Sequence, residues 1–253
     1  MHIPSYNSDT DAARLADFVR KNALGLLTTN IPSQEHQTLQ ISHIPWILKT
    51  GDDPNDTSKW RLQGHLARAN PQARAMVESF TRSGEESSIY TLPDDILVLF
   101  NGLDHYVTPK FYQQTKPDTG KVVPTWDYEA VQMYGRAHAY VDSKAPESKD
   151  FLASQIDELS EHMETSVMKY ERPWKVADAP KPYIDILSKA IIGIEIEVKS
   201  VAGRFKWSQE KPVGDRQGVL DGFKNMENGV ALGERVQTWA DIHDEKKKQK
   251  SNS

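Results

Sequence analysis

The stretch VLFNGLDHYVTPKFYQQTKPDTGKVVPTWDYEAVQMYG, residues 98–135, decides how the rest of the chain is interpreted. Aromatic residues alternate in it with cationic and hydroxyl side chains: Tyr106, Phe111, Tyr112, Trp126, Tyr128 and Tyr134 among His105, Thr108, Lys110, Lys121 and Thr125. Aromatic faces stack on planar rings, and cations and hydroxyls bind phosphate oxygens, so the stretch suits a planar, phosphorylated ligand. Two ordinary strands with cross-strand aromatic packing would give a similar pattern. The long connection, rich in Pro and Gly, favours the ligand-binding interpretation.

The composition is that of an ordinary soluble protein large enough for one large domain or two small ones. The chain has 253 residues, of which 38% are hydrophobic and 26% charged, and its net charge is −5. It has no cysteine, which excludes disulfides, thiolate metal sites and a cysteine nucleophile. A negative net charge disfavours binding of nucleic acid over the whole surface, because phosphate neutralisation needs a clustered basic face.

The beginning of the chain, MHIPSYNSDTD, has neither the basic region nor the apolar core of a secretory signal. No apolar run approaches the roughly 20 residues that span a bilayer. We therefore expect a cytoplasmic protein without a membrane span.

Hydrophobic periodicity and turn residues predict roughly six to eight strands with a few helices at the periphery. Helices are expected at about residues 10–22, 71–80, 150–170, 183–189, 215–225 and 229–242. Strands are expected at 24–30, 37–48, 60–69, 96–100, 105–109, 131–141 and 191–200, with 201–207 continuing or pairing with the last. Asn101-Gly102 predicts a hairpin turn, and Pro45 indicates a strand edge or a bulge. Residues 81–95 are expected to form an insertion loop. The end of the chain is expected to be a charged, frayed tail. A strand that returns after a long helical segment favours closure of a barrel.

Common catalytic and phosphate-binding motifs are absent from the sequence. It contains no GxxxxGK[ST], no GxGxxG opening a helix, no GxSxG and no HExxH, so we predict no metal site and name no catalytic residue. A phosphate can also be held by Lys, Arg, Ser or Thr side chains on adjacent strands. Residue type makes Arg68, Thr108, Lys110, Thr125 and Lys206 candidates for that role.

Six motifs occur in a characteristic order along the chain: MHIPSY at 1–6, SHIPW at 42–46, GHLARANPQ at 64–72, VLFNGLDHYVTPKFY at 98–112, VPTWDYEAVQMYGRA at 123–137 and IIGIEIEVKSVAGRFKWSQ at 191–209. Together they resemble the PaiB-like, FMN-binding negative transcriptional regulators. The resemblance covers roughly residues 1–225.

This resemblance implies an α+β fold, an FMN-binding split β-barrel of the pyridoxamine-phosphate-oxidase type with peripheral helices. It implies residues 1–210 as the barrel domain, with a helical excursion near 145–190, and residues 211–253 as a helical extension with a charged tail. It also implies a homodimer with FMN at the subunit interface. The cofactor-binding residues carried over from the motifs are His43, Ile44, Pro45, His65, Ala67, Arg68, Asn70, Tyr106, Thr108, Lys110, Tyr112, Thr125, Trp126, Lys206, Ser208 and Gln209. Of these, Lys206, Ser208 and Gln209 would reach a site from the other subunit.

The chain departs from the family pattern at Asp127 and Glu210, where Asn is more usual. An added acid repels an anionic ligand, so these two residues are expected to weaken its binding. The function expected is that of a PaiB-type regulator or a flavin-dependent redox protein, which leaves an oxidoreductase open. A haem-binding or haem-degrading split-barrel protein is the alternative, and direct DNA binding is the weakest hypothesis because of the net charge.

Overall fold

The computed structural model describes residues 1–84 and 86–251. Glu85, in the predicted insertion loop, and Asn252 and Ser253, at the end of the predicted tail, lie outside the described residues. The chain forms two compact units, each made of separate segments. Unit 1 comprises Met1–Thr10, Asn101–Val131 and Ala202–Ser253, and unit 2 comprises Asp11–Phe100 and Gln132–Val201. The expected domain boundary at residue 210 stays a prediction.

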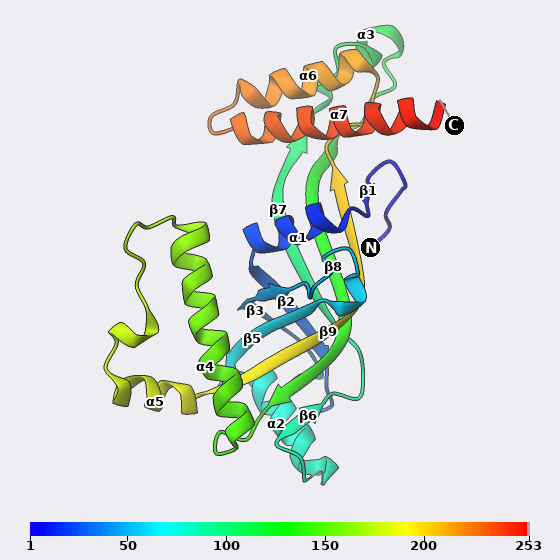
Figure 1. Cartoon of the computed structure of the whole chain (residues 1–253). Helices are drawn as coiled ribbons and strands as arrows, with labels where there is room; N and C mark the ends of the chain where they lie inside the picture. Colours follow the sequence, from blue (N-terminus) through cyan, green and yellow to red (C-terminus); the bar gives the residue numbers. More distant parts are fainter. Residues whose placement is uncertain (85, 252–253) are drawn as a thin grey trace. The chain divides into compact units, whose positions relative to one another are not determined.

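The strands form one sheet in which the pairings of β1 with β9, β2 with β3 and β7, β4 with β5, β5 with β9 and β6 with β8 are antiparallel (Figure 1). Their bounds are β1 Ser8–Asp9, β2 Leu24–Asn30, β3 Leu39–Pro45, β4 Ile47–Lys49, β5 Arg61–Ala67, β6 Ile89–Thr91, β7 Ile96–Val107, β8 Thr125–Tyr140 and β9 Ile191–Lys206. The main path through the sheet is β3-β2-β7-β8-β9-β5-β4, and β7, β8 and β9 contribute residues to both units.

The sheet of unit 2 closes into a barrel because its first and last strands are one piece of chain. β3 pairs with β2 at one end of the path, and β4 pairs with β5 at the other. Trp46 alone separates β3 from β4, so the two ends of the path meet, and β3 also contacts β5. The predicted closure and the α+β split-barrel class are therefore confirmed. The irregularity expected at Pro45 is the break between β3 and β4.

The interior of the barrel is packed around the Trp46 indole, which is 1% exposed. A Cβ atom at Gly64 would lie 2.9 Å from Cε3 of Trp46, and one at Gly25 would lie 2.9 Å from its Cδ1. Real side chains do not approach so closely, so glycine is required on both strands. Alternation along each strand turns the other apolar residues, such as Leu27 and Leu62, into the same core.

The described part of unit 2 contains the helices α1 Ala12–Lys21, α2 Pro71–Ser83, α4 Pro146–Glu161, a π-helix at His162–Val167 and α5 Lys181–Lys189, and short 3-10 helices at Thr57–Lys59 and Val176–Asp178. α2 begins where the sequence predicts, because the Asn70 side chain caps it and Pro71 occupies its first turn. It ends at Gly84, whose φ of 68° is the left-handed conformation that glycine adopts without a steric penalty. The helical excursion expected near residues 145–190 corresponds to α4, the π-helix and α5.

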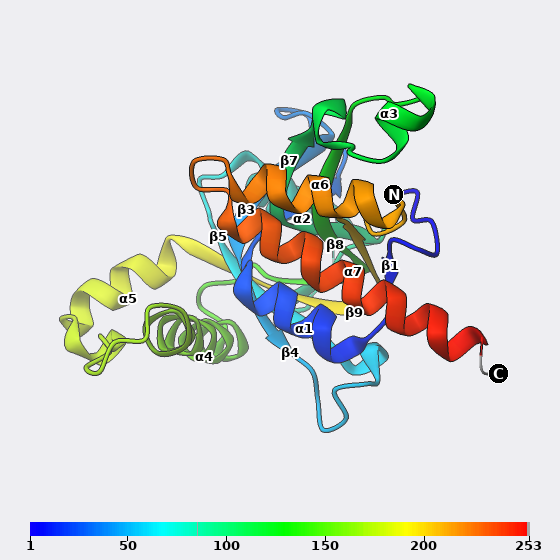
Figure 2. The ribbon, with the colours of Figure 1, turned by 90° about the horizontal axis from the view of Figure 1, so that it is seen from above.

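The helices of unit 1 are α3 Thr115–Thr119, α6 Val213–Lys224 and α7 Val230–Ser251, together with a short 3-10 helix at Pro109–Phe111. α6 and α7 form a helical hairpin. α6 and α7 contact each other along their length and run in opposite directions (Figures 1 and 2). The hairpin has a buried aromatic side in which the rings of Phe205 and Trp239 stack at 4.4 Å.

Three local predictions were wrong. β7 runs through Asn101 and Gly102 as an unbroken strand, because neither residue adopts the positive φ that the expected hairpin turn needs. β8 starts at Thr125, earlier than the start expected for this strand at residue 131. The charged tail is helical to Ser251, since its Glu, Lys and Gln residues are good helix formers. Within the described part of the chain, no helix is long and apolar enough to cross a membrane.

Candidate functional site

The predicted cofactor-binding residues fall into two groups, one in each unit. The group in unit 2 comprises His43, Ile44, Pro45, His65, Ala67, Arg68 and Asn70. The group in unit 1 comprises Tyr106, Thr108, Lys110, Tyr112, Thr125, Trp126, Lys206, Ser208 and Gln209. Each group has its own geometry and is described by itself.

In unit 2, Asn70 fixes the start of α2 to β3. Its Oδ1 atom accepts a hydrogen bond of 2.8 Å from the backbone N–H of Gln72, and its Nδ2 atom donates one of 3.0 Å to the Ser42 hydroxyl. Gln72, 1% exposed, adds further hydrogen bonds from its Nε2 atom to the Leu27 carbonyl at 3.2 Å and the Thr29 hydroxyl at 2.9 Å. The N-terminus of α2 is therefore held rigidly against β2 and β3.

Arg68, just before α2, is anchored by backbone carbonyls rather than by a carboxylate. Its Nη2 atom donates to the carbonyls of Val141 at 2.9 Å and Ile191 at 3.3 Å, and its Nε atom donates to that of Lys189 at 3.3 Å. The carbonyls fix the guanidinium group but leave its positive charge unneutralised. That charge is available to an anion.

A cavity of about 510 Å³ lies beside α2 and collects three basic side chains, those of His36, Arg68 and Arg74. The remaining lining residues are Gln34, Glu35, Val77 and Glu78. The Nε2 atom of His36 is buried and has no hydrogen-bond partner among the described residues. No sequence motif indicated His36 or Arg74 as site residues. For Arg74, the one available signal was its position in the first turns of a helix that starts at Asn70-Pro71, close to Arg68.

The loop over this cavity is clamped to α2. The Ser33 hydroxyl donates to Oε2 of Glu78 at 2.7 Å, and the backbone N–H of Gln34 donates to Oε1 at 3.2 Å. The bond from Ser33 is the largest cause that lowers the pKa of Glu78. Glu78 is thus occupied within the protein, while His36 on the same loop keeps a free ring nitrogen.

The cavity continues onto an open apolar surface on the outside of β2 and β3. A second depression of about 700 Å³ shares Gln34, Glu35 and His36 with the first. Its lining is mixed, with the apolar Leu39, Ile41 and Pro71 beside the polar Gln37, Thr38 and Gln40. We call the surface made by Leu24, Leu39, Ile41 and His43 the β2–β3 face. Leu39 is 68% exposed and Ile41, its neighbour on the same face of β3, is 59% exposed, which is unusual for large apolar residues that adjoin in a sheet. Leu24, also 59% exposed, lies at the other end of this face, where it pairs with Pro45.

The other residues of the unit 2 group have different surroundings. Ile44 points into the barrel and is 1% exposed, so it is part of the core and is not accessible to a ligand on the outside of β3. His65 faces α4, where its Nδ1 atom lies 2.7 Å from Oε1 of the buried Gln155. His43 and His65 are thus not a pair: one lies on the open β2–β3 face and the other beneath a helix.

In unit 1, the group centres on Lys206. Its Nζ atom donates to the Thr125 hydroxyl at 2.7 Å and to the Trp126 carbonyl, and lies 3.7 Å from Oδ1 of Asp127. The Ser208 hydroxyl donates to Oδ2 of Asp127 at 2.8 Å. These contacts join the start of β8 to the end of β9, so Lys206 and Ser208 are engaged inside the unit.

Asp127 is completely buried, and burial raises the pKa of its carboxyl group to about 7. Burial also lowers the pKa of Lys206, against the opposing effect of Asp127. Both shifts favour the uncharged forms, which shows that loss of hydration outweighs the attraction between the two groups. The charge on Asp127, which was expected to repel an anionic ligand, is therefore reduced near neutral pH and grows as the pH rises above 7.

An exposed aromatic pair borders this network. The rings of Tyr106 and Trp126 lie edge to face at 6.1 Å and are 42% and 55% exposed. Tyr112 is buried instead; its hydroxyl lacks a partner among the described residues, and burial raises its pKa to about 12. Gln209 accepts from the Trp207 N–H at 2.6 Å, and the Thr108 hydroxyl accepts from the Lys110 N–H at 3.2 Å.

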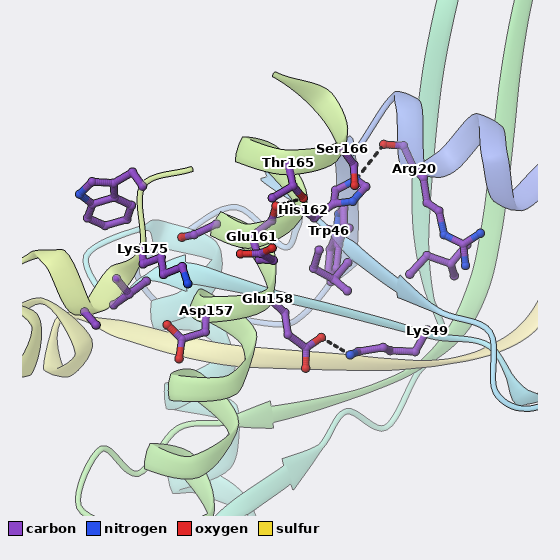
Figure 3. A pocket seen from close by; sticks show the side chains of 16 residues that line it. Arg20, Trp46, Lys49, Asp157, Glu158, Glu161, His162, Thr165, Ser166 and Lys175 are labelled. Carbon is purple, nitrogen blue, oxygen red and sulfur yellow. Dashed lines mark hydrogen bonds and ion pairs between the residues drawn. The ribbon is translucent and has the colours of Figure 1, made fainter. Parts of the chain in front are cut away.

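Another cavity, of about 610 Å³, lies elsewhere in unit 2, between the end of α4, the π-helix and β4 (Figure 3). Lys49 forms an ion pair with Glu158 there, and His162 contacts the Arg20 carbonyl at 3.3 Å (Figure 3). No residue predicted from the sequence lines it. No group of three or more potential metal ligands occurs among the described residues.

Comparison with known proteins identifies the class. The chain belongs to the family described as "Putative FMN-binding domain", whose profile matches residues 1–200. It is 45% identical to an uncharacterized protein of Aspergillus fumigatus, over 97% of this chain and 100% of that one. It is 28% identical to the protease synthase and sporulation protein PAI 2 of Bacillus subtilis, over 90% of this chain and 91% of that one. The predicted resemblance is thereby confirmed.

Among solved structures, the flavocytochrome Anf3 of Azotobacter vinelandii aligns with a TM-score of 0.46 and 12% identity, over 81% of this chain and 72% of that one. FMN is the cofactor of the family to which the chain belongs. It combines a phosphate, a polar ribityl chain and a planar ring. The cavity with His36, Arg68 and Arg74 fits the phosphate, and the adjoining depression offers Leu39 and Ile41 to the ring and polar side chains to the ribityl chain.

Proposed function

We propose that this protein binds FMN beside α2, with the phosphate in the cavity of His36, Arg68 and Arg74 and the ring over Leu39 and Ile41. The observation that supports this most is the continuity of the two depressions, which share residues 34–36. A basic end and an apolar end in one continuous surface match the two ends of FMN.

Each side chain has a distinct role in this proposal. Arg68 and Arg74 supply the charge-assisted hydrogen bonds that phosphate oxygens favour, and the unpartnered His36 Nε2 atom offers a further polar contact. The N-terminal half of α2 adds its dipole, which favours an anion there. The clamp between Ser33 and Glu78 holds the loop in place, so the cations need not be ordered when the ligand arrives.

A homodimer would complete this site. A flavin ring over Leu39 and Ile41 has one face against the protein and the other in water, and the β2–β3 face is apolar beyond the depression. We propose that a second copy of the chain packs on the β2–β3 face and covers the ring. The roles expected of the residues in unit 1, including a contribution from the second copy, stay predictions.

FMN supplies one-electron and hydride chemistry when it is bound. The residues of this chain would bind the phosphate, orient the ring and exclude water from one face. Similarity to PAI 2 supports a regulatory role as a second candidate function. Because the net charge is −5, we propose that such a role acts through binding of a ligand or a protein partner and not through direct binding of DNA. No contact in the described residues favours haem, since His65 is held by Gln155 and His43 stands apart from it.

The test compares FMN with riboflavin, which lacks the phosphate. Quenching of flavin fluorescence on titration should show saturable binding of FMN at one site per chain, and at least tenfold weaker binding of riboflavin. Arg74→Ala should weaken FMN binding about tenfold while leaving riboflavin unchanged, because a charge-assisted phosphate contact contributes about 1.5–3 kcal/mol. Arg172→Ala, in the exposed connector before α5, is the matched control and should bind like the wild type. Absence of saturable FMN binding, or equal loss in both variants, would contradict the proposal.

A further inference from the structure

A small cavity in unit 1 shares only Gln209 with the residues expected to bind the flavin, and none with the proposed flavin site beside α2. Its volume is about 180 Å³, and it is formed by the first residues of the chain, the end of β9 and the face of α7. Its lining residues are Ser5, Tyr6, Ser8, Gln209, Trp239, Ile242, His243, Lys246 and Lys247. Pockets for drug-sized molecules measure about 300–1,000 Å³, so this one suits a small ligand.

The cavity has basic and hydroxyl side chains but no acidic one among its lining residues. His243, Lys246 and Lys247 are three and four residues apart on α7, and helical periodicity therefore places them on one face. Ser5 and Ser8 supply hydroxyl groups from the N-terminal segment. Ammonium and hydroxyl donors that converge from two segments are the groups that bind oxyanions.

The two nearby carboxylates differ in their partners. Asp244 receives two hydrogen bonds from Arg216, at 2.9 and 3.0 Å, so it is engaged by a cation outside the cavity. Asp9 is buried and lies 3.7 Å from Lys246, so an incoming anion shares Lys246 with Asp9. Lys247 and His243 then supply the other polar contacts of the α7 side.

The wall opposite α7 is rigid. Nε2 of Gln209 donates to the carbonyls of Tyr6 at 3.1 Å and Phe205 at 2.5 Å, and the Phe205 ring stacks on Trp239. Ser8 is held in β1, paired with Arg204 of β9. The hydroxyl donors and the basic helix are therefore in place before a ligand binds.

One lining atom lacks a partner. Nε2 of His243 is buried and makes no hydrogen bond within the described residues. Burial is the main cause that lowers the pKa of His243; the nearby Lys247 and Arg216 lower it further, against the opposing effects of Asp244 and Glu210. A neutral imidazole can still contact an oxyanion through an N–H group.

We propose that this cavity binds a small oxyanion of the phosphate type, held by Lys246, Lys247 and His243 on one side and by Ser5 and Ser8 on the other. The site is separate from the proposed flavin site and does not depend on it. The three consecutive lysines at 246–248 differ in position. Lys246 and Lys247 line the cavity, whereas Lys248 does not.

This difference supplies the test. Inorganic phosphate is titrated at constant ionic strength into the full chain carrying Arg74→Ala, which weakens the cationic cavity beside α2, and binding is followed by calorimetry and by ³¹P line broadening. This protein should show saturable binding at one site per chain. Lys247→Glu should weaken it at least tenfold, while Lys248→Glu, which changes the net charge equally, should weaken it less than threefold.

Two further measurements separate this site from others. Arg74→Ala should leave phosphate binding at this cavity intact, even where it weakens FMN binding. Ser8→Ala, which preserves the charge, should also weaken phosphate binding, so the proposal stays testable if Lys247→Glu does not fold. Equal losses in Lys247→Glu and Lys248→Glu, loss in Arg74→Ala, or no saturation would overturn it.

Discussion

The Ser208 hydroxyl donates a hydrogen bond of 2.8 Å to Oδ2 of Asp127, a carboxyl group with no exposed surface. Ser208 reaches it from a backbone φ of 58°, a left-handed conformation that costs a non-glycine residue roughly 1–2 kcal/mol. Oδ1 of Asp127 has no hydrogen-bond partner among the described residues, and Lys206 is 3.7 Å away. Because Asp127 is buried and only partly hydrogen-bonded, we expect its ionisation to make the stability of the protein depend on pH.

Asp127→Asn should make the protein more stable at alkaline pH. The pKa of Asp127 rises from 3.8 to about 7 on folding, so its contribution to stability is complete below pH 3.8 and is lost as pH rises through 7. Asparagine keeps the acceptor for Ser208 and removes the buried charge. At pH 8 we expect the variant to exceed the wild type in free energy of unfolding by on the order of 2–4 kcal/mol. Urea unfolding at pH 5 and pH 8 measures this, and a pH dependence identical to that of the wild type would contradict it.

Gly64→Ala should destabilise the barrel by about 1–3 kcal/mol, because the new methyl group would meet the Trp46 ring at 2.9 Å. Trp46→Phe makes room for it. In a double-mutant cycle measured by chemical unfolding, the cost of Gly64→Ala should therefore be smaller in the Trp46→Phe background. Additive costs would show that Trp46 is not the obstacle.

Gln72→Glu should destabilise unit 2 by about 1–3 kcal/mol or more, since a carboxylate replaces the amide donor that faces the Leu27 carbonyl and the Thr29 hydroxyl. The loss should be smaller at pH 4, where a protonated Glu can still donate. Gln37→Glu, at an exposed position, is the control with the same change of charge. A similar small effect of both substitutions on the thermal midpoint would contradict the assigned role of Gln72.

Ile41→Lys should convert the proposed homodimer into a monomer by placing a charge in the centre of the β2–β3 face. Sedimentation velocity measures the change directly. Ile186→Lys is the control, because Ile186 is an equally apolar residue, 66% exposed on α5. A dimer that survives Ile41→Lys, or a wild type that is monomeric at micromolar concentration, would remove the dimer from the proposal.

Sequence patterns predicted the repeating features of the fold and missed features that depend on backbone conformation. The start of α2 at Asn70-Pro71 follows from capping chemistry, and the alternation in residues 191–200 corresponds to the first part of β9. The hairpin expected at Asn101-Gly102 was wrong, because the same dipeptide is also compatible with an extended strand when long strands pair on both sides. Local propensity is weaker than the hydrogen bonding of a sheet.

By itself the sequence determined the α+β class, the order of most elements and the family, because each depends on short-range patterns and motifs. Only the tertiary structure decided which charged residues meet. It brought His36 from a loop to Arg68 and Arg74 beside α2, and it buried Asp127 next to Ser208, which follows the end of β9. Alternation tells which side of a strand faces inward, but the partner across the sheet depends on chain closure over tens of residues. Burial and charge pairing depend on that partner.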